Sequence, residues 1–346
     1  MNISASNPQK HNPVIDMLRF FAAFMVFVFH LNTFVPPAAN WYRSVVKYGW
    51  LGVPVFFVIS GYCILLSADS AENGQAFLRK RFFRIFPAYW VSLIIVLVAA
   101  LFQKIYTGTN SVANIPRNAL QLAGTLSLFT WPFNHIKITN WVYWTLTCEL
   151  LFYLLISLLF LVRNKYRIFA LIIISLISVE LPHQNEGYLF FFDHWSTFCC
   201  GISLFFFFRN ATRSDWLYWS LFSGINAYNL VIKNFQVQKN EYTIAALLTI
   251  LIIAFSHYSK PSKNILATLG LYSYSLYLIH VPIGVFILGY YKSQAVVRST
   301  FLTVAFDLAA YFLITLVAAF MFKFVEKPCI DYGRKRTKMQ TNHVGT

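Results

Sequence analysis

Long apolar segments separated by short polar stretches follow one another along this chain of 346 residues. Most have the length of about 17 to 25 residues that a helix needs to cross a bilayer. The pattern therefore predicts an all-α fold, a polytopic transmembrane helix bundle of about ten spans. The expected spans are 14–34, 47–68, 82–103, 140–162, 167–182, 188–208, 216–232, 242–258, 267–291 and 300–325.

The composition agrees with a multispanning membrane protein, since 58% of the residues are hydrophobic and only 12% are charged. The net charge of +16 raises the question of nucleic-acid binding. However, the basic residues form short clusters between apolar segments, as in cytoplasmic loops of membrane proteins. We therefore expect contact with membrane lipids and no binding of nucleic acid.

The distribution of basic residues predicts an orientation. If both termini are cytoplasmic, the inside segments hold about twice as many Lys and Arg residues as the outside segments. We therefore expect a multi-pass membrane protein with a cytoplasmic N-terminal segment (1–13), a transmembrane domain (14–328) and a basic cytoplasmic tail (329–346). The polar N-terminus lacks a small-residue cleavage site, so its first span is expected to be retained.

One long connection, 104–139, is predicted to lie outside. It contains an apolar stretch, Leu120 to Trp131, that is too short to cross a bilayer. We expect this stretch to lie in the membrane interface or to fold back as a re-entrant lid.

Arg19 and His30 lie in one unbroken apolar run, Val14 to Phe34. Eleven residues at about 100° each place both side chains on one helix face, about 16 Å apart along the axis. Ionisable groups inside a membrane segment are functional candidates by default. The alternative is that Arg19 extends to the near interface and His30 lies at the far end of the span.

Arg81 and Arg84, three residues apart, share a face where the third span is expected to begin on the cytoplasmic side. Guanidinium groups beside a helix N-terminus suit a phosphate-rich ligand. The alternatives are an ordinary positive-inside anchor or a site for anionic lipid headgroups.

Glu149 lies well inside the fourth apolar span and needs a partner, for which Arg19 and His30 are the obvious types. Paired with a histidine, a carboxylate orients the ring and stabilises its charged form. A structural ion pair between helices is the alternative.

The ninth span carries a polar stripe that is expected to face the interior of the bundle. Ser273, Tyr274, Tyr277 and His280 recur every three or four residues, and Pro282 is expected to kink the helix beside His280. Interhelical hydrogen bonding without catalysis is the alternative for this stripe.

Other polar residues of the apolar segments are weaker candidates. Asp307, Asp193 and His194 lack a supporting pattern, and the five cysteines show neither disulfide nor metal-ligand spacing. We therefore expect no metal site.

Together these residues resemble the integral-membrane acyltransferase type 3 family, the bacterial O-acyltransferases of sugars and polysaccharides. The resemblance extends from residue 14 to residue 328, with the motifs in the order of the family. The matching pieces are Arg19 with His30, Gly52 to Tyr62, Arg81 to Arg84 with Phe86-Pro87, Trp144 with Glu149 and Phe152-Tyr153, Ser273 to Tyr277 with His280 and Pro282, and Glu326-Lys327-Pro328. The chain departs from the family at Thr145 to Cys148, where a serine and aliphatic residues are more usual.

The resemblance implies an O-acetyltransferase that moves an acyl group, most simply acetyl, from cytoplasmic acetyl-CoA to a sugar hydroxyl. The acceptor would be a polysaccharide, such as an exopolysaccharide, or a lipid-linked saccharide at the outer face, and export proteins would be partners. It implies that His30 is the general base, with Arg19 and Glu149 also catalytic, and that Arg81, Arg84, Tyr277 and His280 bind the acyl-CoA.

Two other functions fit the buried charges. A transporter or exporter would use Arg19, Glu149, His280 and Asp307 as an ion or substrate path, although the chain lacks the repeated halves typical of transporters. A non-catalytic partner of a polysaccharide export machine is the second alternative.

Overall fold

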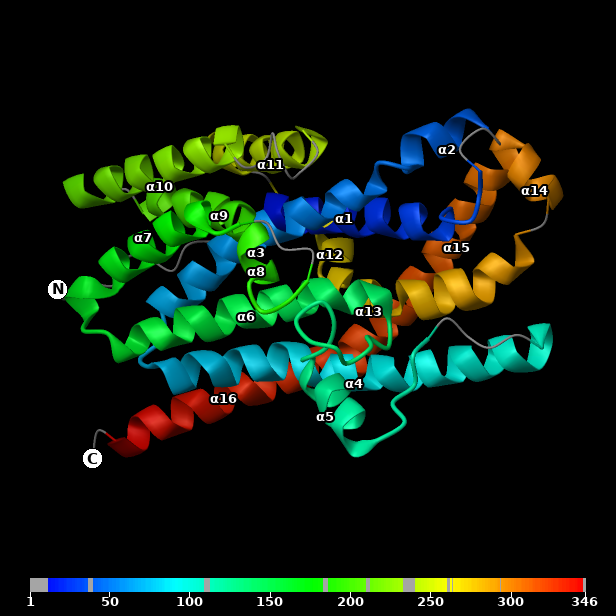
Figure 1. The fold of residues 1–346 in the computed structure, drawn as a ribbon, viewed down its shortest axis with the longest axis horizontal. Coiled ribbons are helices and arrows are strands. Elements are labelled where there is room, and N and C mark those ends of the chain that lie inside the picture. The colour runs from blue at the N-terminus through cyan, green and yellow to red at the C-terminus, as the bar shows by residue number, and fades with distance from the viewer. Residues whose placement is uncertain are drawn as a thin grey trace. The chain divides into compact units, whose positions relative to one another are not determined.

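The computed structural model describes residues 12–36, 40–108, 113–182, 186–209, 212–232, 240–259, 262, 264–292 and 294–344, and every element in these ranges is helical (Figure 1). The expected all-α class is confirmed. Most of the expected N-terminal segment, 1–11, and the basic residues Lys233, Lys239, Lys260 and Lys263 lie outside the described residues.

Each of the ten expected spans overlaps one or more helices, and two of them, 188–208 and 267–291, are interrupted by turns. The elements are α1 (Pro13–Leu31), α2 (Trp41–Val46), η1 (Gly49–Leu51), α3 (Gly52–Asp69), α4 (Gly74–Thr107), α5 (Ala119–Ser127), η2 (Trp141–Tyr143), α6 (Trp144–Leu158), η3 (Leu159–Leu161), α7 (Asn164–Glu180), α8 (Phe190–Asp193), α9 (Trp195–Arg209), α10 (Arg213–Ile232), α11 (Asn240–Ser259), α12 (Ile265–Gly270), α13 (Ser273–Ile279), η4 (His280–Ile287), η5 (Leu288–Tyr291), α14 (Gln294–Arg298), α15 (Thr300–Met321), η6 (Phe322–Glu326) and α16 (Lys327–Val344).

Six helical segments of the described chain are long and apolar enough to cross a membrane. They are Pro13–Leu31, Trp41–Asp69, Gly74–Tyr106, Trp141–Leu161, Ser273–Tyr291 and Thr300–Arg336. Two further helices, Trp195–Arg209 and Asn240–Ser256, are also apolar but shorter. The expected spans 167–182 and 216–232 are the helices α7 and α10, which fall outside both groups.

The described chain divides into two compact units. Unit 1 contains the described residues of Met1–Leu18, Pro54–Leu78 and Cys148–Thr268, and unit 2 those of Arg19–Val53, Arg79–Thr147 and Leu269–Thr346. Each unit draws on three separate stretches of sequence, so long-range contacts hold each of them together.

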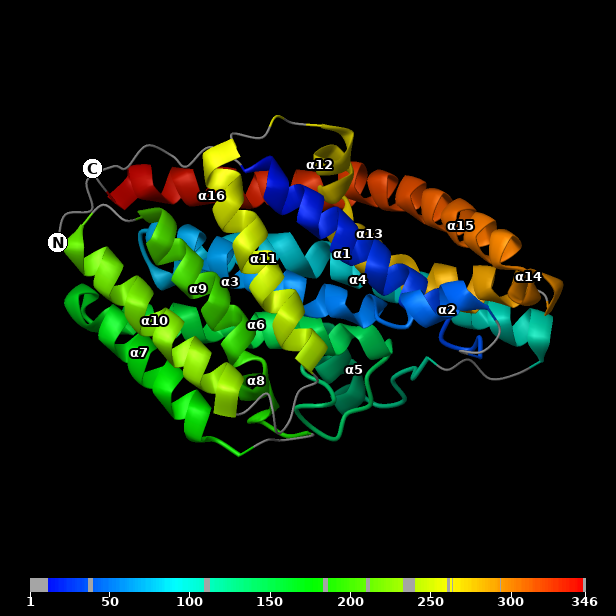
Figure 2. The same cartoon turned by 90° about the horizontal axis from the view of Figure 1, so that it is seen from above.

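Unit 1 is built around α9, which packs against α7, α8, α10 and α11 (Figure 2). An apolar helix without a polar face belongs in a core, and α9 is buried from Trp195 to Phe206. The ring of Phe198 stacks on Phe57 and Phe152 at centroid distances of 4.6 and 4.5 Å. Aromatic stacking therefore joins α3, α6 and α9 in the centre of this unit.

Two glycines let α3 and α9 approach each other closely. A Cβ on Gly61 would lie 2.1 Å from the carbonyl oxygen of Phe198, and one on Gly201 would lie 2.2 Å from that of Val58. These distances are below van der Waals contact with backbone, which cannot move as a side-chain end can. Only glycine fits at this crossing.

We therefore expect Gly201→Ala to destabilise unit 1 by about 1–3 kcal/mol or more through overpacking. Gly224→Ala is the matched control, because a Cβ at Gly224 of α10 meets open space and alanine favours helix. Thermal unfolding of the two variants in detergent measures the difference. Equal melting temperatures would contradict this account of the crossing.

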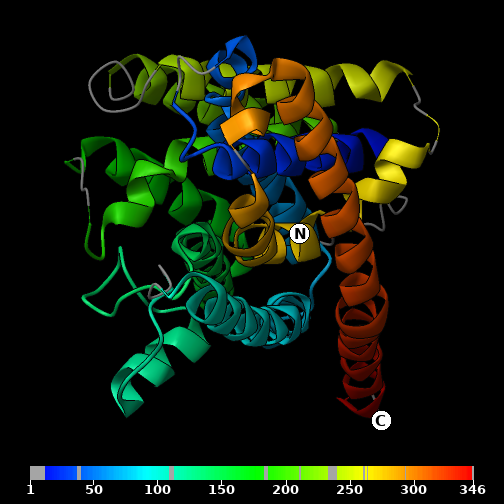
Figure 3. The same ribbon diagram turned by 90° about the vertical axis from the view of Figure 1, so that its right-hand side faces the viewer.

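Unit 2 contains two π-helical segments, each beside a proline. The α-helix α13 gives way to the π-helix η4 at His280, and α15 gives way to the π-helix η6 before α16. Pro282 and Pro328 have no backbone N–H and interrupt the α-helical hydrogen bonds of the preceding turn. The α-helix is thus interrupted beside Pro282, while the expected kink stays a prediction. The elements α15, η6 and α16 form one long rod (Figure 3).

The apolar stretch in the long connection forms the short helix α5, which is anchored to α4. The Tyr89 hydroxyl donates to the carbonyl of Thr125 at 2.5 Å, and the Trp90 indole N–H donates to that of Leu126 at 3.0 Å. Leu120 and Leu122 remain exposed, at 70% and 50%. The exposed apolar side of this short anchored helix is available for contact with lipid, and its position in the interface or as a re-entrant lid stays a prediction.

Candidate functional site

His30 lies near the end of α1, in unit 2. Its Nδ1 atom is 3.0 Å from the carbonyl oxygen of Val26 and 3.1 Å from Nε2 of His280. The ring is half-buried, and that of Trp141 lies 6.4 Å away between centroids. Its Nε2 atom makes no hydrogen bond to any residue that the structure describes.

His280 is 1% exposed, and both of its ring nitrogens are engaged. Nδ1 lies 2.6 Å from the carbonyl oxygen of Tyr277 on the preceding turn, and Nε2 faces His30. The Tyr277 hydroxyl donates in turn to the Val142 carbonyl at 2.9 Å and lies 2.7 Å from the Thr145 hydroxyl. The histidine pair is thus tied to the η2–α6 segment through Tyr277.

The carbonyl partners assign the tautomers of both histidines. A carbonyl oxygen only accepts, so Nδ1 of His280 and Nδ1 of His30 must each carry a proton. Neutral His280 then has a lone pair at Nε2, which accepts from the Nδ1–H group that His30 shares with Val26. This arrangement leaves the lone pair of His30 on Nε2, the protonation state that a general base requires.

The polar stripe of the ninth span faces the interior, as predicted. Ser273, Ser275, Tyr277 and His280 are all buried, with exposures of 7% or less. Tyr274 is half-buried and donates from its hydroxyl to the Ile85 carbonyl at 2.8 Å. The stripe therefore joins α13 and η4 to α4 and α6 within unit 2.

Arg84 forms an ion pair with Glu326 at 2.8 Å, and the Ser275 hydroxyl donates to the same carboxylate at 2.7 Å. Glu326 is 1% exposed, whereas the Arg84 side chain is 33% exposed. Arg19 is close enough to Glu326 for a direct electrostatic interaction. Arg84, predicted from sequence, thus pairs with a carboxylate that was placed in a sequence motif without being given a role.

The expected helix N-terminus beside Arg81 and Arg84 is wrong. α4 begins at Gly74, where Asn73 caps it by accepting from the Ala76 N–H at 2.8 Å. Both arginines therefore lie two or more turns inside a helix whose amides are already bonded. Arg81 and Arg84 still share a helix face. An anion would therefore be bound by their positive charges and not by the free amides of a helix N-terminus.

Glu149 belongs to unit 1, whereas the other predicted site residues belong to unit 2. Its Oε1 atom accepts hydrogen bonds from the Ser60 hydroxyl at 3.0 Å and the Tyr153 hydroxyl at 2.6 Å. The polar partners that an intramembrane carboxylate needs are therefore present within unit 1. Its pairing with His30 or Arg19 stays a prediction.

The sequence pattern did not predict a buried polar cluster formed by Asn32, Lys292 and Asp307, in which Asn32 lies two residues after His30. Lys292 donates to Asp307 at 2.7 Å and to the side-chain oxygen of Asn32 at 2.7 Å, and the Asn32 amide donates to Asp307 at 2.5 Å. The Lys292 side chain is 4% exposed. Burial lowers the pKa of Lys292, and the Asp307 carboxylate opposes that shift. The only sequence signal was an unexplained aspartate in the tenth span.

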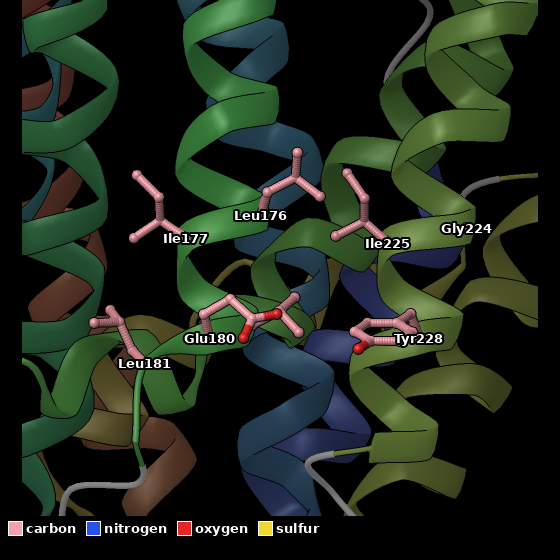
Figure 4. A pocket seen from close by; sticks show the side chains of 8 residues that line it. Leu176, Ile177, Glu180, Leu181, Gly224, Ile225 and Tyr228 are labelled. Carbon is pink, nitrogen blue, oxygen red and sulfur yellow. The ribbon is translucent and has the colours of Figure 1, made fainter.

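An apolar groove of about 560 Å³ lies between α7 and α10 in unit 1 (Figure 4). Leu176 and Ile225 face each other across it, and Glu180 and Tyr228 lie at one end. None of the predicted site residues lines this groove. Its lining provides hydrocarbon contact and no arrangement of groups for acyl transfer.

Comparison with known proteins supports the resemblance to an acyltransferase family. The family model of the acyltransferase domain matches residues 12–323. The O-acetyltransferase OatA of Staphylococcus aureus is 28% identical over 94% of this chain, which spans 58% of the length of OatA. ORF330 of Acidianus two-tailed virus, provisionally named an acetyltransferase, is 25% identical over 79% of this chain and 83% of its own length. No solved structure matches. With nearly the whole chain matched by the family model, the protein belongs to the acyltransferase family, whose members are acyl-transferring enzymes.

Proposed function

We propose that the protein is a membrane O-acetyltransferase that transfers an acyl group, in the first instance acetyl, from acetyl-CoA to a sugar hydroxyl. Family membership supports acyl transfer over transport, and the name of OatA supports O-acetylation. The observation that carries the chemistry is the geometry of His30, whose Nδ1 is engaged and whose Nε2 is left for a substrate proton.

In this proposal His30 is the general base. Nε2 takes the proton of the acceptor hydroxyl while the hydroxyl oxygen attacks the carbonyl carbon of the thioester. The carbon–sulfur bond breaks, the acetyl ester forms, and coenzyme A leaves as a thiolate that receives the proton from the imidazolium. Val26 and His280 accept from the Nδ1–H group throughout and so support the positive charge that His30 carries in between.

We further propose a ten-span bundle in the cell inner membrane, with both termini cytoplasmic. Each of the ten expected ranges contains helix, which supports the number of spans, and the positive-inside bias supports the orientation. Arg19 and Arg84, grouped around Glu326, then lie toward the cytoplasmic side, where acetyl-CoA is available. His30 lies near the other end of α1, toward a polysaccharide or lipid-linked saccharide at the outer face.

Arg81 and Arg84 are the proposed phosphate-binding residues for the donor. We expect Arg81→Gln to raise the KM for acetyl-CoA about tenfold, the loss of roughly one charge-assisted hydrogen bond, with kcat within about twofold. Arg84→Gln also leaves the buried Glu326 without its ion-pair partner, so its folded yield is expected to fall as well. Initial rates at varied acetyl-CoA measure both, with exposed Arg117→Gln as the control. An unchanged KM in Arg81→Gln would remove that arginine from the donor site.

The proposed function is tested with inside-out vesicles of a strain that contains the acceptor glycan and expresses the protein. Radiolabelled acetyl-CoA is supplied outside, and label is followed into the glycan and glycolipid fraction against vesicles without the protein. Protein-dependent label, released by mild alkali as an ester must be, is the expected result. Equal label in both preparations would overturn the proposal.

A further inference from the structure

The ring nitrogens of His280 are placed to contact His30 and the Tyr277 carbonyl and not a ligand. The side chain is 1% exposed, and its two nitrogens are bonded to the Tyr277 carbonyl and to His30. A residue that bound acyl-CoA through these atoms would first have to give up one of these bonds. These hydrogen bonds therefore argue against the role in binding the acyl donor that the resemblance implied for His280.

The ring of His280 is held from two directions. Its Nδ1–H donates to the Tyr277 carbonyl at 2.6 Å, while the Tyr277 side chain is anchored to Val142 and Thr145. The backbone changes from α-helix to π-helix at His280 itself, a local shift typical of functional positions. These contacts direct the Nε2 lone pair at Nδ1 of His30.

We propose that His280 is a positioning residue that selects the Nδ1–H tautomer of His30 and thereby keeps the His30 Nε2 lone pair available to the substrate. This inference rests on the proposed function for its kinetic consequence, but the tautomer itself is a property of the resting protein. Without the Nε2 acceptor of His280, the Val26 carbonyl is the single remaining partner of the Nδ1–H group. The ring is then free to turn, and the competing tautomer places the proton on the atom that must act as base.

Two substitutions of His280 each remove one of its two hydrogen bonds and keep the other. Asparagine places an amide N–H where Nδ1 stands, so His280→Asn retains the bond to Tyr277 and loses the acceptor for His30. Glutamine reaches the position of Nε2 with an amide oxygen, so His280→Gln retains that acceptor and loses the bond to Tyr277. Both variants are polar and of similar size, which makes them a matched pair for folding.

In the vesicle assay we expect His280→Asn to lower kcat at least about tenfold, within the roughly 10²–10⁴-fold that general base catalysis contributes. KM for acetyl-CoA is expected to stay unchanged. His280→Gln is expected to remain within about threefold of wild type, and the same asparagine substitution at exposed His135 to have no effect. Equal losses in both His280 variants, or a rise in KM with unchanged kcat, would overturn the inference.

A second measurement does not depend on activity. ¹⁵N NMR spectra of histidine-labelled protein distinguish imidazoles protonated at Nδ1 from those protonated at Nε2, and the His30→Gln variant identifies the His30 signals. We expect the Nδ1–H form in wild type and His280→Gln, and a mixture or the Nε2–H form in His280→Asn. If wild type transfers no acetyl group but the tautomer still changes, the proposed function fails and the positioning role stands. An unchanged His30 tautomer in His280→Asn overturns the positioning role whatever the activity.

Discussion

Replacement of His30 by glutamine is expected to lower acetyl transfer by at least about a hundredfold, because general base catalysis contributes roughly 10²–10⁴-fold. Glutamine keeps the size and polarity of the imidazole but has no lone pair of comparable basicity to take the hydroxyl proton. The measurement is the rate of label transfer from acetyl-CoA in vesicles, normalised to the amount of folded protein.

His135→Gln is the matched control for this variant, since the same substitution at an exposed loop position should leave the rate unchanged. Membrane insertion and the melting temperature of His30→Gln should stay close to those of wild type, because His30 is half-buried and glutamine keeps the size and polarity of its side chain. Transfer at the wild-type rate by a folded His30→Gln protein would sink the assignment of the base.

Asp307→Ala is expected to destabilise the protein by about 3–5 kcal/mol, the cost of leaving a buried charge without its partner. The ammonium of Lys292 then keeps only the Asn32 side chain of its two strong acceptors, in a site where the lysine side chain is 4% exposed. Thermal unfolding in detergent, followed by the loss of monodisperse protein, measures the change.

The double variant Asp307→Leu with Lys292→Met should recover part of this loss, because removing both charges removes the desolvation penalty but leaves the buried Asn32 side chain without two of its partners. Asp331→Ala is the surface control, since its pair with Arg334 is 3.8 Å long with side chains 49% and 70% exposed. Such pairs contribute about 1 kcal/mol or less. Equal destabilisation by Asp307→Ala and Asp331→Ala would show that the buried cluster contributes no more to stability than a surface ion pair.

Much of the fold could be predicted from the periodicity of apolar residues. Each of the ten expected ranges contains helix, and the buried stripe from Ser273 to His280 faces inward as its spacing indicated. Helix boundaries were less predictable, as the start of α4 at Gly74 illustrates. The expected span begins at residue 82, whereas Asn73 caps the helix and α4 begins eight residues earlier, at Gly74.

The sequence singled out several polar residues of the candidate site one by one, but it did not predict the pairings between them. Periodicity assigns a side chain to a face of its own helix and carries no information about which helix lies opposite. His30 and His280 are 250 residues apart, and Asn32 and Asp307 are 275 apart. For each of these side chains, several partners on other helices were chemically acceptable.

The sequence by itself therefore determined the membrane class, the helices, and the presence of ionisable groups where only function or pairing can sustain them. Tertiary structure alone decided that His30 meets His280, that Arg84 meets Glu326, and that Lys292 meets Asp307. The physical reason is that a buried polar atom must be satisfied by whichever group packing places within about 3 Å. That choice depends on the packing of helices far apart in the chain, which the local sequence pattern does not specify.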